Sequence, residues 1–151
     1  MTFEMNIPVT MHFTIEELYA SDTAKRLGIN NKPSIQKMIN LVYLAAFVLE
    51  PLRVAMGRSI NISSGYRCEQ LNRAVGGAYN SQHLKAQAAD INIEGDMAFG
   101  RKVFDYIKNH LPFDQLIWEH DRSGTYWVHV SYVFPDFGKN RKQVIDGLAK
   151  K

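Results

Sequence analysis

Apolar positions recur at two different spacings along the chain, and these spacings separate an early helical part from a later strand-rich part. The longest helical pattern covers about residues 34–56, where apolar side chains recur mostly every three or four positions. Pro51 falls inside this pattern and is expected to kink or divide the helix. A second amphipathic helix is predicted over residues 97–109, with its apolar side chains on one face.

Shorter patterns predict the remaining elements. Thr14 and Glu17 form a capping-box pattern that indicates a short helix, and another short helix is expected over residues 69–75, closed by two glycines. Strands are indicated by alternating or β-branched runs. These runs cover residues 60–63, 88–93, 115–119 and 126–133, the last two joined as a hairpin by a loop that contains Gly124.

This order of elements predicts a single α+β domain in which N-terminal helices pack on a small antiparallel sheet. The chain has 151 residues, which suits one domain with an ordinary core. We expect that core over about residues 12–134. Residues 135–151 are polar and basic with little to bury, which predicts a loosely attached tail.

Composition narrows the function classes only modestly. The formal net charge of +3 and the pI near 9.0 suit a polyanionic partner such as a cell-wall polymer, but such a balance also serves solubility alone. The one cysteine, Cys68, excludes an internal disulfide and any zinc site built from several thiolates. No cysteine-protease signature surrounds it.

No targeting or membrane segment is expected. The N-terminus lacks the basic and apolar regions of a signal peptide. The longest apolar stretch, residues 41–49, is far too short to cross a bilayer. We therefore expect a protein that is made in the cytoplasm without membrane insertion, and whose action outside the cell would need another export route or lysis.

Three residues offer the ligand set of a catalytic zinc ion. His83 and Asp90 flank an alanine-rich segment that leads from a loop into a strand, and His129 lies on the more polar face of the 126–133 strand. Two imidazoles and a carboxylate leave a fourth position for water. Each residue also has a structural interpretation, because a loop histidine, a strand-end aspartate and a hydrogen-bonded core histidine are all common.

Four motifs in order resemble the zinc D-alanyl-D-alanine carboxypeptidase family of peptidoglycan peptidases, particularly its short phage and prophage members. The resemblance covers about residues 12–132. Its motifs are Ser64-Gly65-Tyr66-Arg67, the segment 71–77, Ser81-Gln82-His83 through Asp90, and Trp127-Val128-His129-Val130-Ser131.

The resemblance implies one Zn²⁺ per chain, held by His83, Asp90 and His129, and metal-assisted hydrolysis of amide bonds in peptidoglycan stem peptides. It also implies that Arg67 holds the substrate near the metal, where a guanidinium can grip a carbonyl or carboxylate. Ser81 matches a family position that hydrogen-bonds the substrate, although it equally suits loop capping.

The remaining site assignments rest on weaker signals. Tyr66 and Trp127 could line the cleft, although aromatic side chains are more often part of a core. We expect a monomer with neither a nucleic-acid partner nor a membrane anchor.

The general base is the weakest assignment. Several relatives carry a glutamate or histidine just before the last ligand, but here Tyr126 and Trp127 occupy those places. Glu119, at the end of the preceding strand, is the best substitute because a hairpin can place it opposite the His129 strand. His120 and Asp121 are the alternatives.

Ala86 is a second departure, because the family usually has glycine there. An alanine is strained if that turn needs a positive φ.

Two functions from different classes fit the sequence. The first is a zinc D,D-carboxypeptidase or endopeptidase that degrades the cell wall as a phage or prophage endolysin, or as a component of the virion. The second is a non-catalytic zinc-binding module of the cell wall or the virion tail, which the departures at Tyr126, Trp127 and Ala86 motivate.

Overall fold

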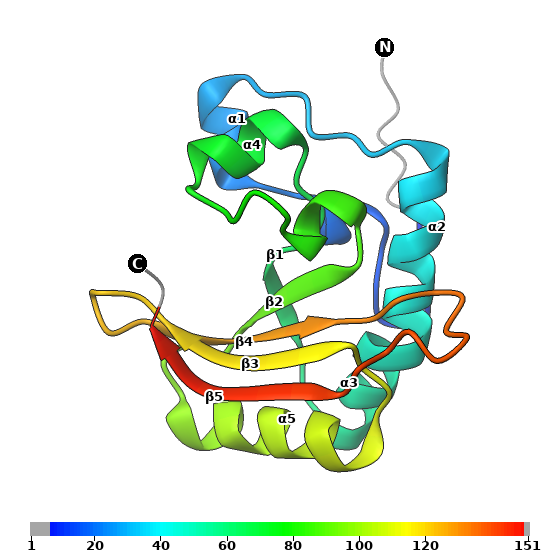
Figure 1. The fold of residues 1–151 in the computed structure, drawn as a ribbon, viewed down its shortest axis with the longest axis vertical. Coiled ribbons are helices and arrows are strands. Elements are labelled where there is room, and N and C mark those ends of the chain that lie inside the picture. The colour runs from blue at the N-terminus through cyan, green and yellow to red at the C-terminus, as the bar shows by residue number, and fades with distance from the viewer. Residues whose placement is uncertain (1–6, 150–151) are drawn as a thin grey trace.

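The computed structural model describes residues 7–149, which form helices packed around one five-stranded sheet (Figure 1). The helices are η1 (Glu16–Leu18), α1 (Asp22–Leu27), α2 (Ile35–Leu44), η2 (Ala45–Leu49), α3 (Glu50–Met56), α4 (Glu69–Ala74), η3 (Gln82–Lys85) and α5 (Met97–His110). The strands are β1 (Asn61–Ser64), β2 (Ala88–Asn92), β3 (Gln115–His120), β4 (Tyr126–Ser131) and β5 (Gln143–Ala149). The N-terminal residues 1–6, on which the signal-peptide prediction rests, lie outside the described part.

The prediction of a single compact α+β domain is confirmed, but the sheet is mixed and not purely antiparallel. Its strand order is β1-β2-β4-β3-β5. The first three neighbouring pairs are antiparallel, as expected, whereas β5 pairs in parallel with β3.

The expectation of a loosely attached tail is wrong. The segment after Pro135 returns along the sheet as β5, in register with β3 from Gln115↔Gln143 onward. An edge strand has one side in solvent, so it can be polar and still be held by its backbone hydrogen bonds. The apolar run of β5 is interrupted by Asp146 and Gly147, so the hydrophobic pattern did not predict this strand.

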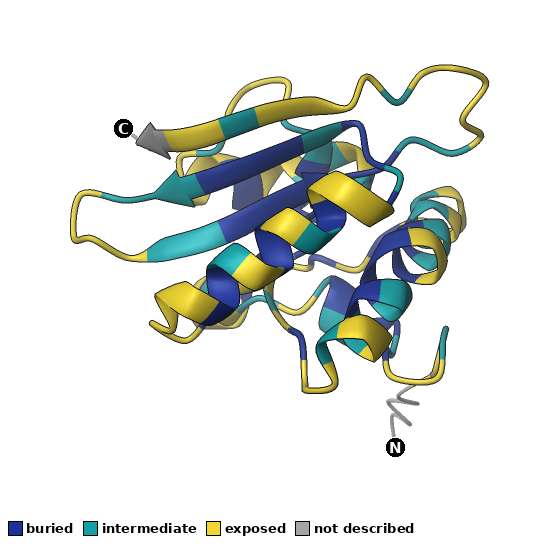
Figure 2. Ribbon diagram, turned by 90° about the horizontal axis from the view of Figure 1, so that it is seen from below, coloured by how far each residue is buried: buried dark blue, intermediate teal, exposed yellow. Residues whose placement is uncertain are grey.

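Helix α5 covers one face of the sheet, so the candidate site lies on the other face. In β4, Val128 and Val130 are fully buried on the α5 side. Gly100 allows this close approach, because a Cβ there would lie 2.6 Å from the ring of Trp118 on β3. Figure 2 shows α5 lying across the sheet with its buried residues turned inward. Since side chains alternate along a strand, His129 points away from α5.

The long helical pattern is confirmed as a continuous run from Ile35 to Met56, made of α2, η2 and α3. Ser34 caps it, with its side chain accepting a hydrogen bond from the Lys37 backbone N–H. The expected effect of Pro51 takes the form of the π-helical turn η2, directly before α3. Proline lacks an N–H and its ring crowds the carbonyl four residues earlier, so the helix widens there.

By length and composition, this run is long and apolar enough to cross a membrane. Its inner face, however, belongs to the core of the domain. Leu41, Leu44, Val48, Leu49 and Leu52 are all fully buried there. A helix that buries several leucines in the core of a domain has such an apolar composition.

The first predicted helix is shorter than its capping-box pattern suggested. η1 is a single 3-10 turn without a side-chain cap, and the Thr14 hydroxyl donates instead to the Glu17 carboxylate at 3.3 Å. A separate helix, α1, follows with its own cap, Ser21, and ends at Gly28 in the left-handed conformation.

Candidate metal centre and active site

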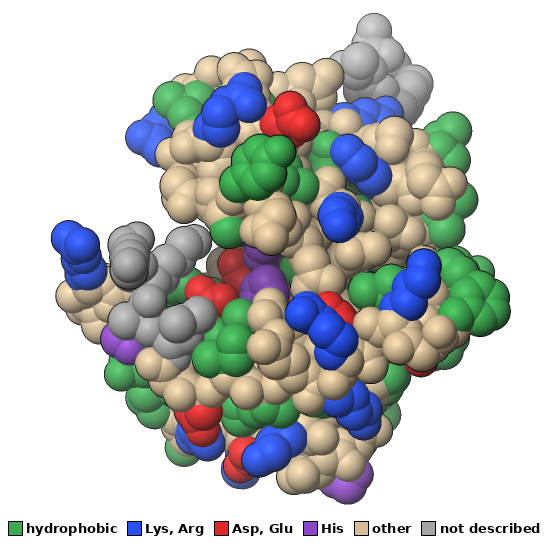
Figure 3. Space-filling model, in the orientation of Figure 1, with side chains coloured by type: hydrophobic (Ala, Val, Ile, Leu, Met, Phe, Trp, Pro, Cys, Tyr) green, Lys and Arg blue, Asp and Glu red, His purple; other side chains and the backbone are tan. Residues whose placement is uncertain are grey.

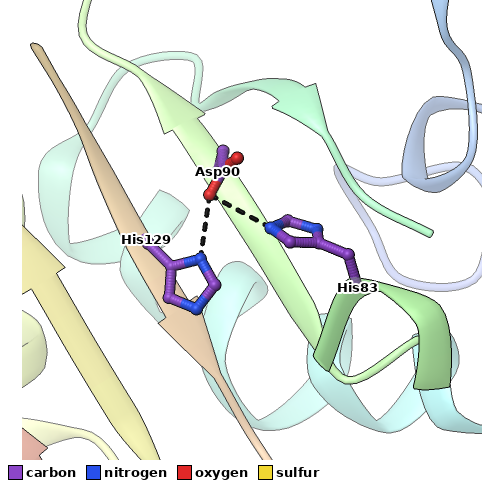
Figure 4. Close-up of side chains that lie close together, drawn as sticks. All are labelled: His83, Asp90 and His129. Carbon is purple, nitrogen blue, oxygen red and sulfur yellow. Dashed lines mark hydrogen bonds and ion pairs between the residues drawn. The ribbon is translucent and has the colours of Figure 1, made fainter. Parts of the chain in front are cut away.

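His83, Asp90 and His129 meet on the open face of the sheet (Figure 4). Asp90 on β2 and His129 on β4 are direct partners in the antiparallel ladder, so their side chains leave the sheet side by side. His83 reaches them from η3. One ligand atom from each residue can be chosen so that all three lie within 4.8 Å of one another. All three residues are buried.

The orientation of His83 is set by a backbone carbonyl. Its Nδ1 lies 2.7 Å from the Gly65 oxygen, and because a carbonyl only accepts, Nδ1 carries the proton. Nε2 therefore has a lone pair, and it lies 3.3 Å from Asp90 Oδ1. Such a carbonyl partner is the usual outer support of a metal-binding imidazole. Gly65 cannot be replaced easily, because a Cβ there would lie 2.0 Å from the Leu18 oxygen.

The charges of the trio suit a divalent cation. Burial opposes ionisation of Asp90, but electrostatic interaction with His83 and a hydrogen bond from His129 hold its pKa far below the ordinary value. Burial lowers the pKa of His83, so this imidazole is neutral at pH 7. A neutral imidazole and an ionised carboxylate are the states in which these groups bind metal. His129 Nδ1 is 3.0 Å from Asp90 Oδ1, which completes two nitrogens and one carboxylate, a donor set that fits zinc.

The turn between the first two ligands does require a positive φ. Ala86 has φ 58° and ψ 34°, and it is fully buried at the end of η3. The left-handed conformation costs a residue with a Cβ about 1–2 kcal/mol. Glycine at this site would lose about 0.5–1 kcal/mol through backbone entropy and about 0.8 kcal/mol through the missing buried methyl. The terms nearly cancel, which explains why alanine is tolerated.

Substitutions at Ala86 test this balance. We expect Ala86→Gly to change the free energy of unfolding by less than about 1 kcal/mol, because the terms above offset each other. Ala86→Val should cost about 3 kcal/mol or more, because a β-branched residue is a severe outlier at this φ and two further methyl groups would have to fit at a fully buried position. Urea unfolding of both variants measures the difference. A valine variant as stable as the parent would show that the turn is not held at positive φ.

The trio lies at one side of a cavity of about 690 Å³. In Figure 3 histidine and acidic side chains are visible in a hollow between the part of the molecule that carries α1 and α4 and the part formed by the sheet. Glu119 of β3 also lines this cavity, and its Oε1 is 3.8 Å from His129 Nδ1. Ladder pairing explains the approach, because Ile117 is the direct partner of His129 and Glu119 lies two residues further along the same face.

The two alternative bases lie elsewhere. His120 points to the other face of the strand, where it packs against Tyr126 with ring centroids 4.9 Å apart. Asp121 is at the start of the hairpin loop, and its Oδ1 accepts hydrogen bonds from Ser123 and Thr125. The described cavity wall includes Glu119 but neither of these two residues.

Arg67 reaches the cavity from the segment between β1 and α4 and is 6% exposed. Burial lowers its pKa, whereas the negative charges of Asp90 and Glu119 act in the opposite direction. Its Nε is buried and has no hydrogen-bond partner among residues 7–149. A guanidinium with an unused buried donor, beside two carboxylates, is placed to bind a polar group of a ligand.

Of the remaining predicted site residues, Ser81 lines the main cavity, whereas Tyr66 and Trp127 are not part of its described wall. Ser81 lines the cavity and also caps η3, accepting a hydrogen bond from the His83 backbone N–H at 3.2 Å. Both interpretations of this serine are therefore compatible with the structure. Tyr66 is a buried core residue that lines a smaller neighbouring cavity of about 320 Å³. Trp127 is half-buried on the site face of β4, but it is not part of the described wall of the main cavity.

Sequence reasoning missed the wall formed by the C-terminal segment. Arg141 and Ile145 line the main cavity, next to Gln115 and Ile117 of β3. The buried carboxylate of Asp114 accepts hydrogen bonds from Arg141 and also from Gln82, the residue before His83. No local pattern marked these residues, because only the parallel pairing of β5 with β3 brings them to the site.

The family model described as Peptidase M15 matches residues 11–131, which include all three candidate ligands, Arg67 and Glu119. No curated protein matches the chain.

Proposed function

This chain belongs to the peptidase M15 family and is therefore a metallopeptidase of zinc-dependent type, and from this premise we propose that it hydrolyses amide bonds in the stem peptides of peptidoglycan. The observation that carries the proposal is the grouping of two histidines and an aspartate beside a carboxylate and a buried arginine, all in one cavity. The reaction is of the D,D-carboxypeptidase or endopeptidase type.

His83, Asp90 and His129 hold the zinc ion in this proposal. When bound, zinc lowers the pKa of a water molecule to about 7 and polarises the scissile carbonyl. Gly65 and Asp90 maintain the ligand geometry, the first through His83 Nδ1 and the second through its contacts with both imidazoles.

Glu119 acts as the general base. It takes a proton from water as the water oxygen attacks the carbonyl carbon, and it then delivers that proton to the nitrogen of the leaving amine as the C–N bond breaks. Its position 3.8 Å from His129 Nδ1 supports this role. Arg67 binds a carbonyl or carboxylate oxygen of the substrate and stabilises the negative charge that develops on the tetrahedral centre. Ser81 contributes a hydroxyl at the cavity wall.

We further propose that the protein is a phage or prophage lysis enzyme, or a part of the virion, which reaches the cell wall after release from the cytoplasm. The basic net charge of +3 supports attraction to an anionic wall. One chain supplies all the groups named above, so a monomer suffices for the reaction.

Digestion of purified sacculi tests the proposed function. With zinc added, we expect new amino termini and mass changes that identify one type of cleaved amide bond. The control is the same protein treated with a chelator and then restored with zinc. Zinc binding at about one ion per chain without any release of amino termini would favour a non-catalytic zinc-binding module.

A further inference from the structure

Arg141 lines the cavity, and hydrogen bonds to the buried carboxylate of Asp114 hold its side chain in place. Its Nε donates to Asp114 Oδ1 at 3.0 Å and its Nη2 donates to Oδ2 at 2.8 Å, while its backbone N–H also binds Oδ1 at 2.9 Å. The Asp114 side chain is 4% exposed, whereas that of Arg141 is 59% exposed. The guanidinium is therefore held in place on one side and open on the other.

The hydrogen bonds to Asp114 leave other N–H groups of the Arg141 guanidinium available for a second anion. A guanidinium has five N–H groups, and Asp114 uses two of them. Within residues 7–149 no hydrogen bond from Nη1 is found, so the Nη1–Nη2 edge can donate two parallel hydrogen bonds to a second carboxylate. Gln82 also donates to Asp114, at 3.0 Å, which offsets part of the negative charge of this carboxylate.

The strand register gives the distance from this edge to the metal centre. Ile117 is the partner of His129, and Gln115 is the partner of Gln143, two residues after Arg141. Measured along the strand direction, the backbone of Asp114 lies three residues from the level of His129, about 10 Å, and the backbone of Arg141 lies about one residue further, at about 13 Å. An extended peptide covers that span with about three or four residues.

The cavity floor is apolar at the level of the metal centre, and Gln115 lies between that level and Asp114. Ile117 and Ile145 are direct partners in the parallel pair β3–β5, and both line the cavity. These two isoleucines can contact the aliphatic part of an extended ligand. Arg141 can bind a negatively charged group further along the same ligand. The carboxylate of a single leaving residue would lie too close to the scissile bond to reach Arg141.

We propose that Arg141 binds a carboxylate of the substrate three to four residues from the scissile bond, and that the enzyme thereby selects stem peptides whose acidic side groups are free and not amidated. This inference rests on the proposed function. Arg141 lies outside residues 11–131, so the family match does not assign it.

The test compares Arg141→Met with Arg101→Met. Arg101 on α5 also pairs with an aspartate, Asp146 of β5, through two hydrogen bonds of 3.1 and 3.2 Å, but it does so from the opposite face of the sheet. The probes are two synthetic stem peptides that are identical except that the acidic groups are free in one and amidated in the other. Steady-state kinetics give KM and kcat for each peptide.

We expect the parent enzyme to show a KM about tenfold lower for the acidic peptide, the scale of one charge-assisted hydrogen bond. Arg141→Met should raise this KM about tenfold, to the value for the amidated peptide, with little change in kcat. Arg101→Met should keep the preference. Arg141→Lys retains the positive charge but lacks the paired N–H donors of a guanidinium, so its KM for the acidic peptide should be intermediate. This variant keeps the test usable if the methionine variant does not fold.

Calorimetric binding of both peptides to the zinc-loaded Glu119→Gln variant, with and without the Arg141→Met change, separates the two proposals. Tighter binding of the acidic peptide that depends on Arg141, without turnover by the parent enzyme, would support the subsite and contradict the proposed function. Turnover of both peptides with equal KM, or equal effects of the two arginine variants, would overturn the subsite and leave the proposed function in place.

Discussion

Glu119→Gln is expected to lower kcat by about 10²- to 10⁴-fold, the usual contribution of a general base. Glutamine has nearly the shape of glutamate but cannot accept the proton of the attacking water. The zinc content should stay at about one ion per chain, since Glu119 is outside the ligand trio. The measurement is release of amino termini from sacculi, together with metal analysis of the same sample.

Matched controls for Glu119 come from its two neighbours. His120→Gln and Asp121→Asn change groups that lie next in sequence but outside the described wall of the cavity. Both variants should retain nearly the parent rate. Full activity of Glu119→Gln, with a large loss in one of these two variants, would transfer the base role to that neighbour.

Asp90→Asn is expected to remove zinc from the protein and to abolish hydrolysis. The substitution keeps the shape of the side chain but removes the only carboxylate of the trio. It also removes the negative charge near buried Arg67 and the two imidazoles, so the metal-free protein should lose about 3 kcal/mol of stability, as when a buried ion pair is broken.

Metal analysis and urea unfolding of the chelated protein check the two effects separately. Asp105→Asn serves as the control, because the Asp105 carboxylate is largely exposed and lies 4.0 Å from Arg101 in a surface ion pair. Such a pair contributes less than about 1 kcal/mol to stability. An Asp90→Asn protein that still carries one tightly bound zinc ion would rule out the proposed ligand set.

The candidate site was largely predictable, since its residues occur in ordered motifs. His83 and Asp90 are separated by seven positions, and they were expected to meet through a loop followed by a strand; they do meet, but His83 lies in the short 3-10 helix η3 before β2. The hairpin prediction also placed Glu119 and His129 on neighbouring strands. Alternation along a strand is a local property, so the choice of face could be derived without tertiary contacts.

The cavity as a whole was not predictable in the same way. Ala86 could be marked as a departure, but only the structure showed that its φ is positive and that its methyl is fully buried. Tyr66 and Trp127 are aromatic residues for which the pattern left core and cleft open, and packing against distant elements decided their positions. Trp127 lies outside the described wall of the main cavity, and Tyr66 borders only the smaller one.

By itself, the sequence determined the α+β class and most helices and strands, and it predicted that His83, Asp90, His129 and Glu119 would lie close together, as they do in the cavity. These features depend on spacing within short segments, where side-chain periodicity and backbone preferences act locally. The tertiary structure alone decided that residues 143–149 form a parallel edge strand and that Arg141 and Ile145 complete the cavity. An edge strand is held by backbone hydrogen bonds to a partner that is distant in the sequence, and those bonds cannot be read from the residues of the strand itself.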